Sequence, residues 1–214
     1  NEHAHYTHSR MSEVLGMPFQ AIASVENGSM NCSKLEEVLA QLHSNGAKST
    51  IVVTLGTTGM GAVDPLEEII PIARAYGASI HVDAAYGGYF TLANFPKDVQ
   101  CHFTAMAAAD SIVIDPHKHG LQPYGCGAVL FKNPEEGRFY KHDSPYTYFT
   151  SDQLHLGEIT LECSRAGADA AALWATQQKF PYVRSGNFAQ RLNASLAAAQ
   201  GLKNTLLAKG RWET

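Results

Sequence analysis

The 214-residue sequence has little charge imbalance and no long apolar segment, and these absences exclude several classes of protein. Charged residues make up 17% of the chain and the formal net charge is −4, so no basic excess favours nucleic acid or an anionic membrane. No apolar run approaches the ~20 residues that a membrane-spanning helix needs, and no signal peptide opens the chain. We therefore expect a cytoplasmic protein without a nucleic-acid or membrane partner.

Closely spaced cysteines are also lacking. The four cysteines are scattered, without the near pairs of zinc ribbons or redox motifs: Cys32, Cys101, Cys126 and Cys163. Reduced thiols in the cytoplasm fit this spacing best. His3, His5 and His8 resemble metal ligands, but no carboxylate or cysteine completes a set with them, so no metal is expected.

What the chain does contain is an alternation of strand-like and helix-like segments. The apolar runs predict strands at 19–24, 50–55, 79–83, 111–115 and 126–131. Helical periodicity, with Ser33 to Glu36 read as a capping box and Asp64-Pro65 as a second start, predicts helices at 33–45, 64–77, 99–109, 166–179 and 188–208. The alternation indicates an α/β fold with a mostly parallel sheet flanked by helices. The last strand follows Lys118 too soon for a helical crossover, so it runs antiparallel or reaches the sheet through an unusual connection.

Three chemically distinctive stretches follow predicted strands. They are "GTTGMGAVDP" (56–65), "DAAYGG" (83–88) and "DPHKHG" (115–120). Ligands of open α/β sheets bind at the carboxyl ends of the strands, so these stretches are expected at one edge of the sheet. On its own Lys118 is most simply a surface lysine. Its convergence with Asp83 on that edge favours a functional amine instead.

These motifs resemble the group II amino-acid decarboxylases, which are fold-type I enzymes that use pyridoxal 5′-phosphate. The likeness rests on "HVDAAYGG" followed by "DSIVIDPHKHG", and it extends in the expected order over nearly the whole chain. "HAHYTHSRMSEVLG" is similar to the segment that carries the family's cofactor-stacking histidine. "VTLGTTGMGAVDP" resembles its threonine-bearing strand end, and "ECSRAGADAAALW" its Ser-Arg…Leu-Trp helix entry.

The resemblance implies a role for each matching residue. Lys118 would form the Schiff base with pyridoxal phosphate, and Asp83 would pair with the pyridinium nitrogen. His5 would stack on one face of the cofactor ring, and Ala85 would lie under the other face. The resemblance implies three further roles. His117 would reach the phosphate or the substrate, and Thr57 would sit near the phosphate or ring. The proton donor is sought among Tyr146, Tyr148 and His155.

The chain departs from the family in length, because full-length members are roughly twice as long. We expect residues 1–160 to be a partial cofactor-binding large domain without the upstream phosphate loop. Residues 161–214 would be a helical continuation towards an absent small domain. The expected function is decarboxylation of an L-amino acid to the amine and carbon dioxide, in a homodimer. Other fold-type I chemistry stays open, namely a carbon–carbon lyase, an aldehyde-forming oxidative decarboxylase or an aminotransferase, as does an inactive fragment. The sequence leaves the substrate undefined.

Overall fold

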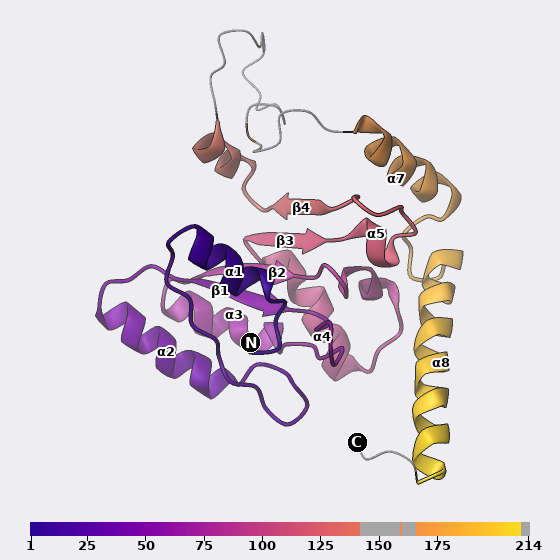
Figure 1. Ribbon diagram of the computed structural model, residues 1–214, viewed down its shortest axis with the longest axis horizontal. Helices are drawn as coiled ribbons and strands as arrows, with labels where there is room; N and C mark the ends of the chain where they lie inside the picture. The colour runs from indigo at the N-terminus through magenta and orange to yellow at the C-terminus, as the bar shows by residue number, and fades with distance from the viewer. Residues whose placement is uncertain (142–158, 160–165, 211–214) are drawn as a thin grey trace, which may run out of the picture.

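A four-stranded sheet with helices packed around it organises the protein in the computed structural model, which describes residues 1–141, 159 and 166–210 (Figure 1). The strands are β1 (Thr50–Thr54), β2 (Ser79–Asp83), β3 (Ser111–Ile114) and β4 (Ala128–Phe131). The α-helices are α1 (Thr7–Val14), α2 (Cys32–Ser44), α3 (Leu66–Ala75), α4 (Lys97–Ala105), α5 (Pro116–His119), α7 (Gly167–Lys179) and α8 (Asn187–Ala208). Three 3-10 helices are η1 (Gly88–Leu92), η2 (Met106–Ala108) and η3 (Pro134–Tyr140).

The sheet is mostly parallel, as the sequence predicts. The strand order is β1-β2-β3-β4, with β1, β2 and β3 parallel and β4 antiparallel to β3. In register, Asp83 lies opposite Thr54 on one side and Val113 on the other. The prediction that the last strand cannot follow a helical crossover is confirmed, because only the four-residue helix α5 and a loop join β3 to β4.

The core lies between the sheet and the helices α2, α3 and α4, which contact one another in series. Alternate strand residues such as Val53, Ile80 and Val82 are fully buried, and Leu66 and Ile69 of α3 are fully buried as well. Helix α8 runs along the side of the molecule and contacts η1 near its own N-terminal end (Figure 1). These contacts fix β2 and β3, the two strands that carry the motif residues.

Three sequence predictions about element bounds are wrong. Residues 19–24 do not form a strand, because only an isolated bridge between Ser24 and Met30 forms there. Helix α2 begins before Ser33, because the side chain of Asn31 accepts the Lys34 N–H and takes the capping position. The helix expected at 99–109 begins earlier, at Lys97, and ends in a 3-10 turn.

Asp64 ties the loops beneath the sheet edge together. Its carboxylate is fully buried and accepts hydrogen bonds from the backbone N–H groups of Met30 (2.7 Å) and Thr54 (2.8 Å) and from the Asn1 side chain (2.6 Å). Burial raises the pKa of Asp64, and these hydrogen bonds oppose that rise. The residue predicted to start helix α3 is therefore a cross-link between three segments.

Gly87 allows the β1 and β2 ends to approach closely. A Cβ atom at this position would lie 1.9 Å from the Leu55 carbonyl oxygen, which belongs to the backbone. Only glycine fits such an approach without moving the chain. The "DAAYGG" stretch thus has a packing requirement as well as a chemical one.

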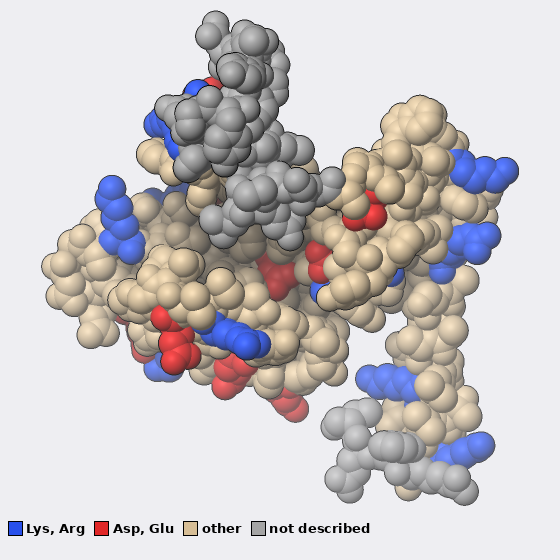
Figure 2. All heavy atoms as spheres, turned by 45° about the horizontal axis from the view of Figure 1, so that its top comes forward, with Lys and Arg blue, Asp and Glu red and all other residues tan. Residues whose placement is uncertain are grey.

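The sequence-based expectations about membranes, surface charge and the proton donor can be compared with the structure. None of the helices in the described part of the chain is long and apolar enough to cross a membrane. On the face shown in Figure 2, Lys and Arg side chains are spread over the surface and do not gather in one patch. The predicted proton-donor candidates Tyr146, Tyr148 and His155 lie outside the described residues.

Candidate functional site

The candidate site lies where β2 and β3 end. Asp83 is the last residue of β2, and Lys118 belongs to α5, the short helix that follows β3. Because β2 and β3 are parallel neighbours, both residues lie at the same edge of the sheet. This is the edge at which open α/β sheets bind their ligands.

Asp83 is a buried carboxylate with two hydrogen-bond donors. Its Oδ2 lies 2.8 Å from Nε2 of His8, and its Oδ1 accepts the Ala85 backbone N–H at 3.1 Å. Its side chain is only 9% exposed. Burial alone would raise the pKa of Asp83, but hydrogen bonds from His8 and Ala85 and the charges of His8 and His81 together lower it. Asp83 is therefore ionised at neutral pH.

His8 belongs to this candidate site, although the sequence analysis gave it no role beside Asp83. Since the ionised Asp83 can only accept, His8 donates from Nε2. His81, two residues before Asp83, pairs through Nδ1 with the Ser111 hydroxyl at 2.8 Å. Burial, followed by the nearby charge of His8, lowers the pKa of His81, and the charge of Asp83 opposes this shift. His8 is thus the side chain that holds the Asp83 carboxylate in place.

Lys118 has its own carboxylate partner. Its Nζ lies 3.0 Å from Oδ2 of Asp115, and its side chain is 33% exposed, so the amine is accessible from solvent. His117 also lies near Asp115, with Nε2 at 3.8 Å from the same oxygen. The Nδ1 of His117 donates to the Cys126 carbonyl at 2.7 Å, which fixes the orientation of its ring.

His119 completes this short helix with a buried nitrogen. Its ring makes edge contacts with Tyr86 (4.6 Å between centroids) and Phe90 (4.8 Å). Its Nε2 is buried and has no hydrogen-bond partner among the residues that the structure describes. Burial, and secondarily the charge of Lys118, lowers the pKa of His119. The residue that follows Lys118 in the chain therefore favours a neutral imidazole.

The other predicted residues lie around this centre in different ways. His5 is half-buried in the segment before α1, where its Nδ1 lies 2.9 Å from the Thr7 hydroxyl. Thr57 is 1% exposed, and its hydroxyl oxygen accepts the Ala62 N–H at 3.0 Å within the loop after β1. Ala85 contributes its backbone N–H to Asp83. Ala85 therefore contacts Asp83 directly, and His117 lies in the same short helix as Lys118. Neither His5 nor Thr57 hydrogen-bonds to Asp83 or Lys118.

Comparison with known proteins identifies the class to which this fold belongs. The Rhodiola rosea 4-hydroxyphenylacetaldehyde synthase structure superposes with a TM-score of 0.78 at 20% identity, over 97% of this chain and 43% of that one. The chain is 34% identical to an L-2,4-diaminobutyrate decarboxylase of Acinetobacter baumannii, over 82% of this chain and 35% of the relative. It is 29% identical to an L-tyrosine decarboxylase of Enterococcus faecium, over 94% of this chain and 39% of the relative.

The fold is that of the large domain of fold-type I pyridoxal-phosphate enzymes. The family model of the pyridoxal-dependent decarboxylase conserved domain matches residues 1–214. The chain belongs to the pyridoxal-dependent decarboxylase family, which confirms the resemblance found in the sequence. It spans 35% and 39% of the lengths of the two curated relatives named above.

The residues at the sheet edge fit the cofactor of this family. Pyridoxal phosphate carries an aldehyde that reacts with an amine and a ring nitrogen that pairs with a carboxylate. The edge offers the accessible amine of Lys118 and the ionised carboxylate of Asp83. Asp83 uses one hydrogen bond on each oxygen, and each carboxylate oxygen can accept a second one. The sheet edge therefore offers the amine and the carboxylate that the cofactor requires.

Proposed function

We propose that the enzyme containing this chain decarboxylates an L-amino acid to the amine and carbon dioxide, with pyridoxal phosphate on Lys118. The observation that carries the proposal is the ionised Asp83, held by His8 and Ala85 at the same sheet edge as the Lys118 amine. When bound, the cofactor supplies an electron sink for the bond that breaks.

The chain's own residues have distinct tasks in this proposal. Asp83 would pair with the ring nitrogen and favour its protonated form, because an opposite charge within ~4–6 Å stabilises the charged state. Lys118 would hold the cofactor through its amine, which now lies 3.0 Å from the Asp115 carboxylate. The resemblance to the family's motifs assigns His5 to one face of the cofactor ring and Ala85 to the other. His117 is assigned to the phosphate or substrate, and Thr57 to the vicinity of the phosphate or ring.

We also propose a cytoplasmic homodimer. Large apolar side chains at the end of η3 support an interface, since Phe139 is 69% exposed and Tyr140 is 62% exposed. Cys32, Cys101 and Cys126 are free thiols, which suits a reducing compartment. Light scattering of the active enzyme tests this assembly. A monomeric mass for an enzyme that still turns over substrate would contradict the dimer.

A product assay of the full-length enzyme tests the proposed reaction. 2,4-Diaminobutyrate, tyrosine and aspartate are the first substrates to offer, because named family relatives act on amino acids of these kinds. We expect one of them to yield carbon dioxide and the amine in equal amounts. Lys118→Ala should abolish turnover, while Lys132→Ala, beyond the end of β4, should keep it. Carbon dioxide with an aldehyde would instead favour the oxidative alternative, as in the chemistry named for the Rhodiola rosea synthase.

A further inference from the structure

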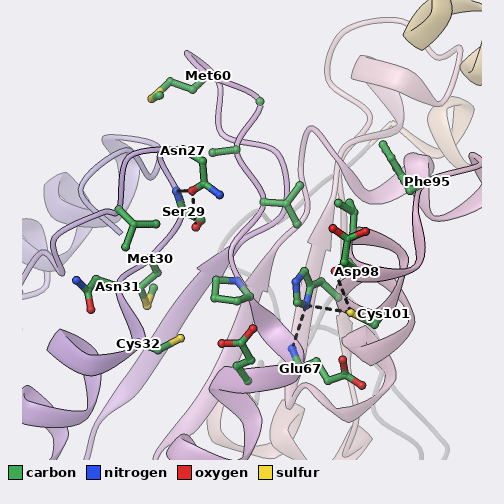
Figure 3. A pocket seen from close by; sticks show the side chains of 18 of the residues that line it. Asn27, Ser29, Met30, Asn31, Cys32, Met60, Glu67, Phe95, Asp98 and Cys101 are labelled. Atoms are coloured by element: carbon green, nitrogen blue, oxygen red, sulfur yellow. Dashed lines mark hydrogen bonds between the residues drawn. The ribbon is translucent and has the colours of Figure 1, made fainter. Parts of the chain in front are cut away.

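A second polar hollow lies outside the candidate site. It has a volume of about 960 Å³ and opens between the start of α2, the loop after β1 and the first turns of α3 and α4 (Figure 3). None of its lining residues belongs to the Asp83–Lys118 edge. Its ionisable lining groups are three carboxylates, two thiols and one imidazole, without a lysine or arginine: Glu67, Glu68, Asp98, Cys32, Cys101 and His102. Such a lining favours a cation.

Three of these groups converge at the spacing of metal ligands. A carboxylate oxygen of Glu67, the Sγ of Cys101 and the Nδ1 of His102 all lie within 4.8 Å of one another. The Cys101 sulfur is 3.6 Å from His102 Nδ1. In a tetrahedral zinc site, metal–ligand lengths of ~2.3 Å for sulfur and ~2.0–2.1 Å for nitrogen separate these two atoms by about 3.5 Å. The thiol and the imidazole therefore already have the separation that zinc imposes.

The packing of two helices holds the three ligands together. Glu67 lies in the first turn of α3, and Cys101 and His102 lie in α4, which contacts α3. His102 Nδ1 meets the Glu67 backbone N–H at 3.5 Å, longer than a good N–H hydrogen bond (Figure 3). Glu67 is exposed, and one of its carboxylate oxygens already lies within 4.8 Å of the other two ligand atoms. The Cys101 thiol donates to the Asp98 carbonyl at 3.0 Å. A metal would replace these contacts with three metal–ligand bonds.

We propose that Glu67, Cys101 and His102 bind a divalent transition metal, zinc above all, with the fourth position open to water in the hollow. A thiolate, an imidazole and a carboxylate are the ligands of zinc sites, whereas magnesium and calcium take oxygen ligands. The bound ion would link α3 to α4. The sequence-based expectation of no metal considered the histidines near the N-terminus, while this cluster joins segments that are distant in the sequence. The site does not depend on the proposed decarboxylation.

Cobalt(II) is a suitable probe because a cobalt–thiolate bond absorbs in the near ultraviolet. The full-length protein, freed of metal by a chelator, is titrated with cobalt chloride before the cofactor is added. We expect one equivalent to produce the thiolate charge-transfer band and the visible bands of four-coordinate cobalt, and zinc to displace both. Cys101→Ser should remove the charge-transfer band, and His102→Gln and Glu67→Gln should each weaken binding at least tenfold.

Cys32→Ser is the matched control, because Cys32 lines the same hollow outside the cluster. It should leave the band and the affinity unchanged. Far-ultraviolet circular dichroism of each variant shows whether it is folded, and the two conservative Gln variants remain informative if Cys101→Ser is not. The absence of a charge-transfer band, its persistence in Cys101→Ser, or its loss in Cys32→Ser would overturn the proposal.

Discussion

Replacing Asp83 with asparagine in the full-length enzyme isolates the charge at the centre of the proposed function. The amide has nearly the same shape, and its oxygen can still accept the Ala85 N–H that now lies 3.1 Å from Oδ1. Its NH₂ group would replace Oδ2 and donate to His8 Nε2, which accepts in its other tautomer. The local fold should therefore survive while the negative charge is lost.

The expected loss follows from that charge. The Asp83 side chain is only 9% exposed, so solvent screens its interaction with a ring nitrogen weakly. An opposite charge within ~4–6 Å typically shifts a pKa by ~1–3 units, or about 1.4–4 kcal/mol. If this free energy is lost from the transition state, kcat falls by roughly ten- to a thousandfold.

Turnover and cofactor absorbance should separate in this variant. We expect kcat, measured as carbon dioxide release, to fall as above while the visible absorbance of the bound cofactor largely persists, because Lys118 is untouched. Asp110→Asn is the matched control, since Asp110 pairs with Arg74 just before β3, at the opposite end of that strand from Lys118. Its kcat should stay within about twofold of wild type. Wild-type turnover by Asp83→Asn would refute the assignment of Asp83 to the ring nitrogen.

Two further substitutions test the supporting structure. His8→Ala should raise the pKa of Asp83, because a charge-assisted hydrogen bond is lost. The pKa can be measured by ¹³C NMR of labelled aspartate carboxyl groups. That bond is worth ~1.5–3 kcal/mol of stability. Because the fold lowers the pKa of Asp83, this stability should be present at neutral pH and vanish as the pH falls through the folded pKa. If His8→Ala lowered the free energy of unfolding equally at all pH values, the pairing would be contradicted. Gly87→Ala should destabilise the protein by ~1–3 kcal/mol in urea unfolding, because its Cβ would overlap the Leu55 carbonyl, whereas Gly59→Ala, with open space around it, should have little effect; equal unfolding midpoints would show that the close approach is not required.

The buried strands were predictable because each combines an apolar run with a turn signal at its end. "TIVVT" and "SIHVD" have both features, and they form β1 and β2. "FQAIAS" is also rich in apolar residues but forms only one isolated bridge, and Phe19 is 48% exposed. Composition describes a strand's compatibility with a sheet, and it carries no information about whether a partner strand is available.

The candidate site was predictable to the extent that it follows from topology. Asp83 and Lys118 follow neighbouring parallel strands, and the rule that ligands bind at strand ends places them together. The pairing of His8 with Asp83 joins residues 75 positions apart and has no local sequence signal. Only the docking of α1 onto the sheet edge reveals it. The same is true of the Glu67–Cys101–His102 cluster, which depends on the packing of α3 against α4.

Chemical trapping of the cofactor on its lysine tests the central claim most directly. Borohydride reduction of the full-length enzyme with pyridoxal phosphate bound makes the linkage permanent, and peptide mapping then locates the modified residue. The proposed function predicts a pyridoxyl group on Lys118 in about one copy per chain, and none on the Lys118→Ala variant after the same treatment. A pyridoxyl group on Lys132 or Lys141 in place of Lys118 would contradict the assignment of this sheet edge as the cofactor site.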